Sequence, residues 1–226
     1  MNDVPELILI DKPKGITSFD VIRRLRRLLN IKKMGHAGTL DPLATGLMII
    51  GVGPGTKRLA GLIKLDKEYI AEVLIGEQRT TGDMEGEVVD EKVVEEAAEI
   101  LQSKISAALT DLVGEIELPV SAYSAIKVDG VPMYKRARKA EKTGETVTDV
   151  PMRTMRVFET ELFKVEKVGD RAVATIRFKV GSGTYIRSLA EEIGRQIEYP
   201  ATLQNLRRIK VGEFDIEMAQ QIENFK

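Results

Sequence analysis

Short apolar runs separated by polar stretches mark the first level of order in this chain. Runs at residues 7–10 and 47–52, and a longer stretch at 68–75, predict buried β-strands. Between residues 171 and 180 apolar and polar side chains alternate, which predicts a strand with two different faces. One face carries Ala172, Ala174, Ile176, Phe178 and Val180, and the other carries Val173, Thr175, Arg177 and Lys179.

Three stretches carry apolar residues at helical spacing. After a turn at residues 12–15, Thr17 or Ser18 can cap a helix whose apolar face holds Phe19, Ile22, Leu25 and Leu29. Residues 93–112 and 188–197 predict two further helices. The glycine-rich run at 51–57 has neither the spacing of a phosphate loop nor that of a dinucleotide fingerprint. We therefore interpret it as a strand-to-helix turn.

The order of these elements indicates the fold class. Strands and helices mix without a regular βαβ repeat, and no internal repeat is visible. This favours an α+β fold with one mixed, mostly antiparallel sheet flanked by helices and loops. With 226 residues and 43% hydrophobic content, the chain can fill a sizeable core. We expect a single domain over residues 1–226, with a basic flap inserted near residues 122–151.

Composition excludes several classes of protein. No apolar run approaches the roughly 20 residues needed to cross a bilayer, and the N-terminal residues lack the pattern of a secretory signal. The chain has no cysteine and one histidine, so disulfides, thiolate metal sites and structural zinc are not expected. We expect a cytoplasmic protein that uses neither a metal nor a cofactor.

Charge is balanced overall but unevenly distributed. The net charge is −1, yet basic residues gather in three places while acids gather at residues 83–99. The basic clusters comprise Arg23, Arg24, Arg26, Arg27, Lys32 and Lys33; then Lys135, Arg136, Arg138, Lys139 and Lys142; and finally Arg207, Arg208 and Lys210. A nucleic-acid face opposite a solvated acidic face would give this pattern, and so would ordinary solvated helix faces. We weigh the two interpretations about equally.

Residues 35–46 form the segment with the most chemical content. They place one carboxylate, Asp41, among glycines, hydroxyls and the only histidine of the chain. Gly35, Gly38 and Gly46 allow turns that side chains would forbid, and Pro42 restricts the backbone directly after the acid. The pattern is typical of a carboxylate that is held in place for chemistry.

This segment resembles the defining motif of the TruB family of tRNA pseudouridine synthases, Gly-His-x-Gly-x-Leu-Asp-Pro, in which the Asp is the catalytic nucleophile. Three further segments match the family in order along the chain, at residues 66–69, 181–187 and 206–208. The resemblance covers essentially residues 7–214. Because so many matches occur in the family's order, coincidence is a poor explanation.

The resemblance implies a pseudouridine synthase fold and roles for individual residues. Asp41 would be the nucleophile, Tyr69 would stack on the target uracil, and Arg187 would pair with the catalytic carboxylate. The remaining expected substrate contacts are Tyr185 and Leu206 in the base pocket, His36 on the RNA, and Lys67 beside Tyr69. Without the family, Tyr185 and Leu206 would be interpreted as core residues, and a lone histidine such as His36 is structural in about half of cases.

The residue types also suit the implied reaction. Isomerising uridine to its C-glycoside needs a nucleophile that breaks the glycosidic bond or adds to the ring, and a pocket that retains the base while it rotates. A dry pocket raises the pKa of a carboxyl group unless a cation such as Arg187 keeps it ionised. The phenol of Tyr69 can move the proton that must leave C5. Reaching a nucleotide in a folded loop requires flipping it out, at a cost of a few kcal/mol.

The resemblance further implies a substrate and an organisation. The substrate would be uridine 55 in the T loop of tRNA, bound through the T arm by a monomer that needs no guide RNA and no membrane. Residues 1–183 would form the N-terminal catalytic part and residues 184–226 the C-terminal segment. Bacterial relatives usually continue into an RNA-binding PUA domain, which we do not expect here. Two alternatives stay open: a guide-RNA-dependent uridine isomerase of the dyskerin type, and an RNA chaperone that refolds tRNA.

Overall fold

The computed structural model describes residues 4–121, 123, 126–128, 130–143 and 150–225. The chain divides into two compact units. Unit 1 comprises Met1–Ala71, Arg177–Gly183 and Asn205–Lys226, and unit 2 comprises Glu72–Ile176 and Thr184–Gln204. Each unit is therefore assembled from stretches that are distant in the sequence.

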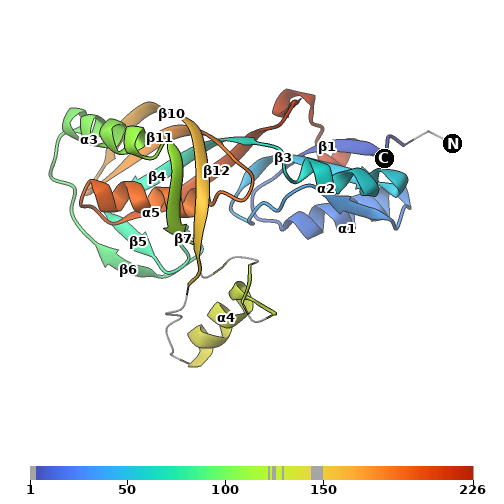
Figure 1. Cartoon of the computed structure of the whole chain (residues 1–226), viewed down its shortest axis with the longest axis horizontal. Helices are drawn as coiled ribbons and strands as arrows, with labels where there is room; N and C mark the ends of the chain where they lie inside the picture. The colour runs from blue at the N-terminus through green and yellow to red at the C-terminus, as the bar shows by residue number, and fades with distance from the viewer. Residues whose placement is uncertain (1–3, 122, 124–125, 129, 144–149, 226) are drawn as a thin grey trace. The chain divides into compact units, whose positions relative to one another are not determined.

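The main sheet confirms the expected α+β class, with mixed and mostly antiparallel pairing. Its strand order is β1-β3-β12-β4-β11-β10-β7, with β2 added to β3 and β13 to β12 (Figure 1). The bounds are β1 Leu7–Lys12, β2 Met34–His36, β3 Thr45–Val52, β4 Lys67–Ile75, β7 Gly114–Pro119, β10 Met152–Val168, β11 Arg171–Val180, β12 Ala201–Val211 and β13 Phe214–Asp215. Strands β4, β11 and β12 have residues in both units. The predicted strands at 7–10, 47–52, 68–75 and 171–180 are all confirmed.

Unit 1 is built around β3, whose residues from Gly46 to Val52 are all buried. Strand β1 pairs with β3 antiparallel, with Leu7 opposite Gly51, and β12 joins β3 in parallel, with Arg208 opposite Gly46. The turn expected at residues 51–57 is confirmed, because β3 leads into the 3₁₀ helix η1 (Gly53–Arg58) and then α2 (Leu59–Leu62). The short 3₁₀ helices η2 (Ile216–Met218) and η3 (Ile222–Asn224) end the unit.

Helix α1 (Ser18–Leu29) begins where the sequence predicts, with Thr17 as its cap. The Thr17 hydroxyl accepts a hydrogen bond from the Asp20 amide, and the Asp20 carboxylate in turn accepts one from the Thr17 amide, a reciprocal capping box. The expected apolar face is wrong at Phe19, which is 56% exposed. Its ring lies 5.9 Å from the guanidinium carbon of Arg26, a cation–π contact on the helix surface. Val21, Ile22 and Leu25 form the buried face instead.

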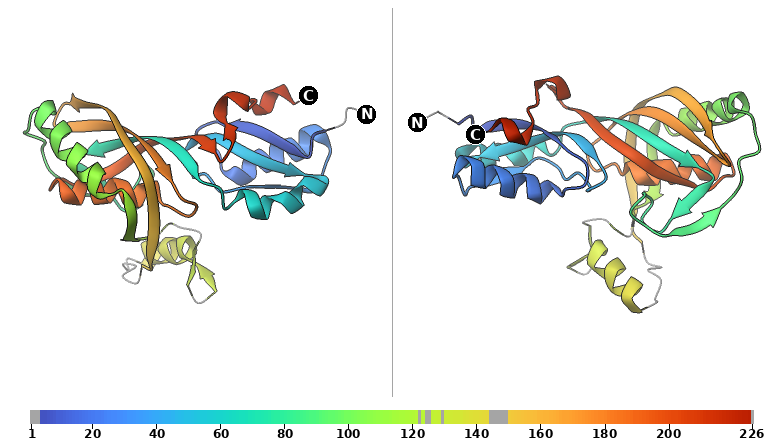
Figure 2. Two further views of the ribbon diagram at one scale, coloured as in Figure 1. Left: turned by 45° about the horizontal axis from the view of Figure 1, so that its top comes forward. Right: turned by 180° about the vertical axis from the view of Figure 1, so that it is seen from behind.

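Unit 2 packs helices on the other strands of the sheet. Helix α3 (Ala98–Asp111) contacts β10, and α5 (Ile186–Gln196) contacts β7. Strands β7 and β10 pair antiparallel, with Pro119 opposite Met152. The hairpin of β5 (Glu77–Arg79) and β6 (Val88–Glu91) forms a separate two-stranded sheet (Figure 2).

Two helix boundaries differ from expectation. The helix expected over residues 93–112 begins only at Ala98, because Ala97 has an extended backbone and Val94 is buried outside the helix, where its amide donates to the Asp170 carbonyl. The helix expected at residues 188–197 begins two residues earlier, at Ile186. In the range of the expected flap, the described residues form β8 (Lys127–Val128), β9 (Val131–Pro132) and α4 (Met133–Thr143). Arg138 and Lys142 have side chains outside the described part of this segment.

Candidate active site

The loop that carries Asp41 connects β2 to β3 and is tightly held. Gly38 and Gly46 have φ values of +98° and +104°, in the region that favours glycine. Gly35 has no positive φ; a Cβ there would lie 2.9 Å from Leu59 Cδ1, so the end of the Leu59 side chain would have to shift. A Cβ at Gly46 would lie 2.2 Å from the Arg208 carbonyl oxygen. The backbone path around the half-buried Asp41 therefore depends on its glycines.

Hydrogen bonds from α1 and the preceding turn hold the same loop. The Ser18 hydroxyl donates to the Leu40 carbonyl at 2.9 Å and accepts from the Leu40 amide at 2.8 Å. The Gly15 amide donates to the Pro42 carbonyl at 2.8 Å. Thr17 thus caps the helix, while Ser18, the other capping candidate, fixes the residue directly before Asp41.

Lys12, a residue that the sequence interpretation missed, lies beneath the loop. It is fully buried at the end of β1, and its ammonium donates to the Ala44 carbonyl at 2.7 Å and to the Pro13 carbonyl at 3.0 Å. A longer contact of 3.4 Å reaches the Pro42 carbonyl. The alternation of β1 contains a signal for this, since position 12 shares the buried face of Ile8 and Ile10.

His36 lies at the end of β2 and is half-buried. Its Nδ1 atom is buried and has no hydrogen-bond partner among the described residues. Burial lowers the pKa of His36 below its ordinary 6.5; a hydrogen bond to the Gly38 backbone opposes this in part, and the charge of Arg208 adds a smaller lowering effect. The imidazole is therefore neutral at neutral pH, and its contact with RNA stays a prediction.

Lys67 and Tyr69 share the buried face of β4. The Lys67 ammonium donates to the carbonyls of Ile63 and Leu65 at 2.6 and 2.5 Å, just after α2. Burial, together with the charge of Arg208, lowers the pKa of Lys67 to about 8. These contacts give Lys67 a structural role in this state, while its expected substrate contact stays a prediction. Tyr69 is 8% exposed, and Leu206 on β12 is half-buried.

Arg187 lies in the first turn of α5 and is held by polar groups of unit 2. Its Nη1 atom donates to the Thr81 carbonyl and to the Ser121 hydroxyl, both at 3.0 Å. The same nitrogen lies 3.6 Å from Asp83 Oδ2. Tyr185 is the half-buried N-cap of this helix, and its amide contacts Met155 Sδ at 3.5 Å.

Asp83 is a second residue that the sequence interpretation missed. Residues 83–99 predicted a solvated acidic face, but Asp83 is only 3% exposed. Its carboxylate accepts from the Thr81 hydroxyl at 2.6 Å and from the Glu85 amide at 3.1 Å. No local sequence signal distinguishes it from its acidic neighbours, because its burial depends on Arg187, distant in the chain.

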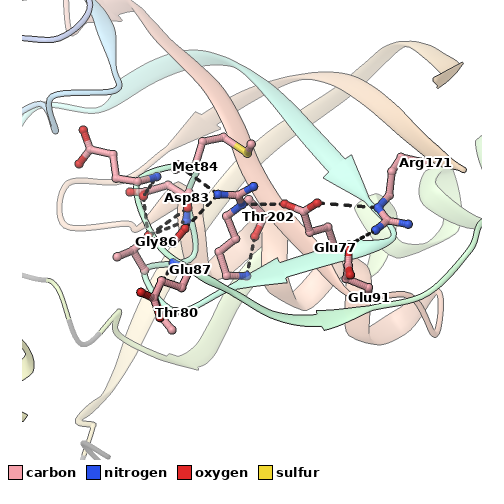
Figure 3. A network of polar contacts seen from close by, with 12 residues as sticks. Glu77, Thr80, Asp83, Met84, Gly86, Glu87, Glu91, Arg171 and Thr202 are labelled. Carbon is pink, nitrogen blue, oxygen red and sulfur yellow. Dashed lines mark hydrogen bonds and ion pairs between the residues drawn. The ribbon is translucent and has the colours of Figure 1, made fainter. Parts of the chain in front are cut away.

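The loop that bears Asp83 is fixed by a wider polar network (Figure 3). Arg79 donates to the Gly86 carbonyl at 2.9 Å and pairs with Glu77 at 2.6 Å, while its amide donates to the Thr202 hydroxyl at 3.1 Å. The Thr80 amide donates to the Glu87 carbonyl at 2.9 Å, closing the loop. Arg187 therefore contacts a loop that is itself held by several hydrogen bonds, and not Asp83 alone.

The seven candidate residues divide between the two units. Unit 1 contains His36, Asp41, Lys67, Tyr69 and Leu206, and unit 2 contains Tyr185 and Arg187. Pairing of Arg187 with Asp41 stays a prediction. Within the described ranges, no group of three or more His, Cys, Asp or Glu side chains is placed to hold a metal ion. No helix among the described residues is long and apolar enough to cross a membrane.

Comparison with known proteins gives this geometry a context. Residues 26–186 match the family described as TruB family pseudouridylate synthase (N terminal domain). A tRNA pseudouridine synthase B from Leifsonia xyli subsp. xyli is 40% identical over 216 residues, which cover 96% of this chain and 70% of that protein. The protein of the same name from Fusobacterium nucleatum subsp. nucleatum is 41% identical over 211 residues, which cover 93% of this chain and 69% of that protein.

A solved structure is similar at lower identity. A chain in the structure of an H/ACA RNP bound to a substrate RNA containing 2′-deoxyuridine aligns with a TM-score of 0.65 and 26% identity. The alignment covers 96% of this chain and 51% of that chain, so this chain spans about half its length.

Proposed function

Since the chain belongs to the TruB family of pseudouridylate synthases and isomerises uridine to pseudouridine in tRNA, we propose that it acts on uridine 55 in the T loop with Asp41 as the nucleophile. The observation that carries this proposal is the segment of residues 35–46. It matches the family's motif without a gap, and glycine geometry, Ser18 and Lys12 hold its loop in one shape. A nucleophile gains most from being held in place before the substrate arrives.

The proposed reaction keeps all atoms of the nucleotide. Asp41 attacks the flipped-out nucleotide, the glycosidic bond to N1 breaks, and the base rotates within the pocket. C5 then bonds to the sugar, the bond to Asp41 breaks to release the carboxylate, and N1 takes up a proton while C5 loses one. Tyr69 stacks on the base and accepts the proton that leaves C5. Tyr185 and Leu206 line the base pocket, and Arg187 pairs with the Asp41 carboxylate. His36 and Lys67 complete the proposed contacts with the RNA.

The proposed binding mode uses the T arm and the basic segments. Exposed arginines on α1 and the basic residues around α4 contact phosphates, and the segment near residues 122–151 closes on the RNA. The enzyme acts as a monomer without guide RNA, in the cytoplasm where its tRNA substrate is processed. Identity near 40% to proteins named tRNA pseudouridine synthase B supports tRNA as the substrate.

A guide-dependent isomerase is the second candidate, favoured by the likeness to the H/ACA RNP structure. The experiment that separates the two incubates the purified protein with an unmodified tRNA transcript and no other RNA. Pseudouridine is mapped by reverse-transcription stops at carbodiimide adducts. We expect one stop, at position 55, and none in a transcript with cytidine at that position. A reaction that occurs only after guide RNA is added would overturn the proposal.

A further inference from the structure

Arg208 is a buried cation next to the Asp41 loop that the proposed reaction leaves unused. It lies on β12, is 1% exposed, and stands opposite Gly46 in the parallel pairing with β3. The sequence places it in an exposed-looking basic cluster with Arg207 and Lys210. Arg207 fits that description better, since it is half-exposed and pairs with Asp11 at 2.8 Å. The two neighbouring arginines therefore have different surroundings.

The guanidinium of Arg208 joins the two ends of the segment that carries Asp41. Its Nε donates to the Leu47 carbonyl at 2.7 Å, and its Nη2 donates to the Gly38 carbonyl at 3.3 Å. A Cβ at Gly38 would lie 3.5 Å from Arg208 Nη1, an ordinary contact, so glycine is required there by its φ of +98° rather than by space. One planar group thus fixes the distance between a residue three positions before Asp41 and a residue six positions after it.

The electrostatic surroundings of Arg208 make a purely stabilising role a poor explanation. Among the residues that the structure describes, no carboxylate lies within 4.0 Å of its nitrogens, and its hydrogen bonds go to backbone carbonyls. A buried cation without a counter-charge costs free energy. Arg208 also acts unfavourably on its neighbours, because its charge lowers the pKa of both His36 and Lys67. An apolar residue would fill this space at lower cost.

We propose that Arg208 is a positioning residue for the reaction: its forked guanidinium holds the ends of the loop of residues 38–47 so that Asp41 is presented in one orientation. This inference rests on the proposed role of Asp41 as the nucleophile. The role requires arginine, because two donors at a fixed angle reach two carbonyls at once, whereas the single ammonium of lysine is a compact point charge. Lys12 holds the middle of the same loop from β1, so the two cations act at different points.

The test compares Arg208→Lys and Arg208→Ala with the unchanged protein. A displacement of about 1 Å at a reacting group costs on the order of 100-fold in rate, so we expect kcat to fall about 100-fold in both variants. The KM and the Kd for tRNA should change by less than about threefold, since loop orientation affects the transition state rather than binding. Methylguanidinium added to Arg208→Ala should restore part of kcat, and it should not help Arg208→Lys. Arg195→Lys, at an exposed arginine on α5, is the matched control and should keep full activity.

Three outcomes would overturn the proposal. In the first, kcat of Arg208→Lys is unchanged. In the second, kcat falls only in proportion to the unfolded fraction measured by circular dichroism, without rescue by methylguanidinium, which indicates a structural role alone. In the third, Kd rises and its salt dependence weakens while kcat is kept, which indicates contact with an RNA phosphate. Asp41→Asn is measured in parallel, to distinguish failure of the Arg208 proposal from failure of the proposed function. If Asp41→Asn is active, Asp41 is not the nucleophile, whatever the result for Arg208.

Discussion

At the scale of single residues, unit 1 contains several cations that sit in the interior rather than on the surface. Lys12, Lys67 and Arg208 are 0%, 6% and 1% exposed. Each donates to backbone carbonyls, which partly compensate the loss of water. For Lys67, the charge reduces stability by an amount that depends on pH.

Lys67 allows this cost to be measured. Its pKa in the folded protein is about 8, below the ordinary 10.5. The cost of the buried charge is fully present below pH 8. Between about pH 8 and 10.5 the unfolded chain binds more protons than the folded one, so the free energy of unfolding rises with pH. We expect the urea midpoint of the unchanged protein to rise across this window relative to that of Lys67→Met.

The control for this measurement is Lys64→Met, at an exposed lysine of the same segment. Its midpoint should run parallel to that of the unchanged protein across the window. A constant difference between the unchanged protein and Lys67→Met from pH 7.5 to 10.5 would contradict the lowered pKa.

The residues that the sequence predicted and those it missed differ in how far along the chain their contact partners lie. Asp41 stands within a compact motif of glycines and proline, so its surroundings are encoded next to it. Asp83 and Arg208 act through partners more than 100 residues away, Arg187 and the carbonyls of Gly38 and Leu47. No local pattern contains such pairs, and polar residues carry no periodicity that would mark them as buried.

At the scale of elements, α1 combines a buried face with an exposed basic one. Ser18, Val21, Ile22 and Leu25 are buried, whereas Arg24 and Arg27 are exposed and lie in the second half of the helix. Hydrogen bonds from Thr17 and the neighbouring Arg23 hold the pKa of Asp20 well below its ordinary value, so the capping box stays charged at neutral pH. The capped helix α1 therefore holds its exposed arginines on a well-defined backbone.

If this face binds tRNA, the double variant Arg24→Gln/Arg27→Gln should bind more weakly and depend less on salt. Each lost phosphate contact should reduce the slope of log K against log[salt] by about 0.7 to 0.9. Filter binding over a range of salt concentrations measures this slope. Lys104→Gln/Lys164→Gln, at exposed lysines paired with Glu96 and Glu166, removes the same charge elsewhere. Equal slopes for the two double variants would mean that α1 has an ordinary solvated face.

Elements were predictable where burial differs between their faces. The alternation of β11 is regular, with every second residue buried from Ala172 to Val180, and the sequence predicted it correctly. Strand β10 is longer, at 17 residues, but most of it is exposed or half-buried, so no apolar pattern marks it. Its first residues are ordered by pairing with β7 instead. Such a strand is stabilised by hydrogen bonds between backbones, and the pattern of side chains in the sequence does not reveal these bonds.

At the scale of the whole molecule, a net charge of −1 coexists with local basic clusters. The α+β class followed from the absence of a βαβ repeat. The division into two units has no marker in the sequence, because each unit combines separate stretches. In the proposed function one carboxylate does the chemistry and many cations bind the RNA, so a single substitution can separate catalysis from binding.

The most direct test of this account is Asp41→Asn, which keeps the shape of the side chain and removes its nucleophilic charge. We expect pseudouridine formation in an unmodified tRNA transcript to fall below detection, while the Kd for the same tRNA stays within about threefold, since the phosphate contacts remain. A refolding activity, if the protein has one, would survive this change. Retention of even a few per cent of the turnover by a correctly folded Asp41→Asn protein would contradict the account, because the nucleophile would then be another group.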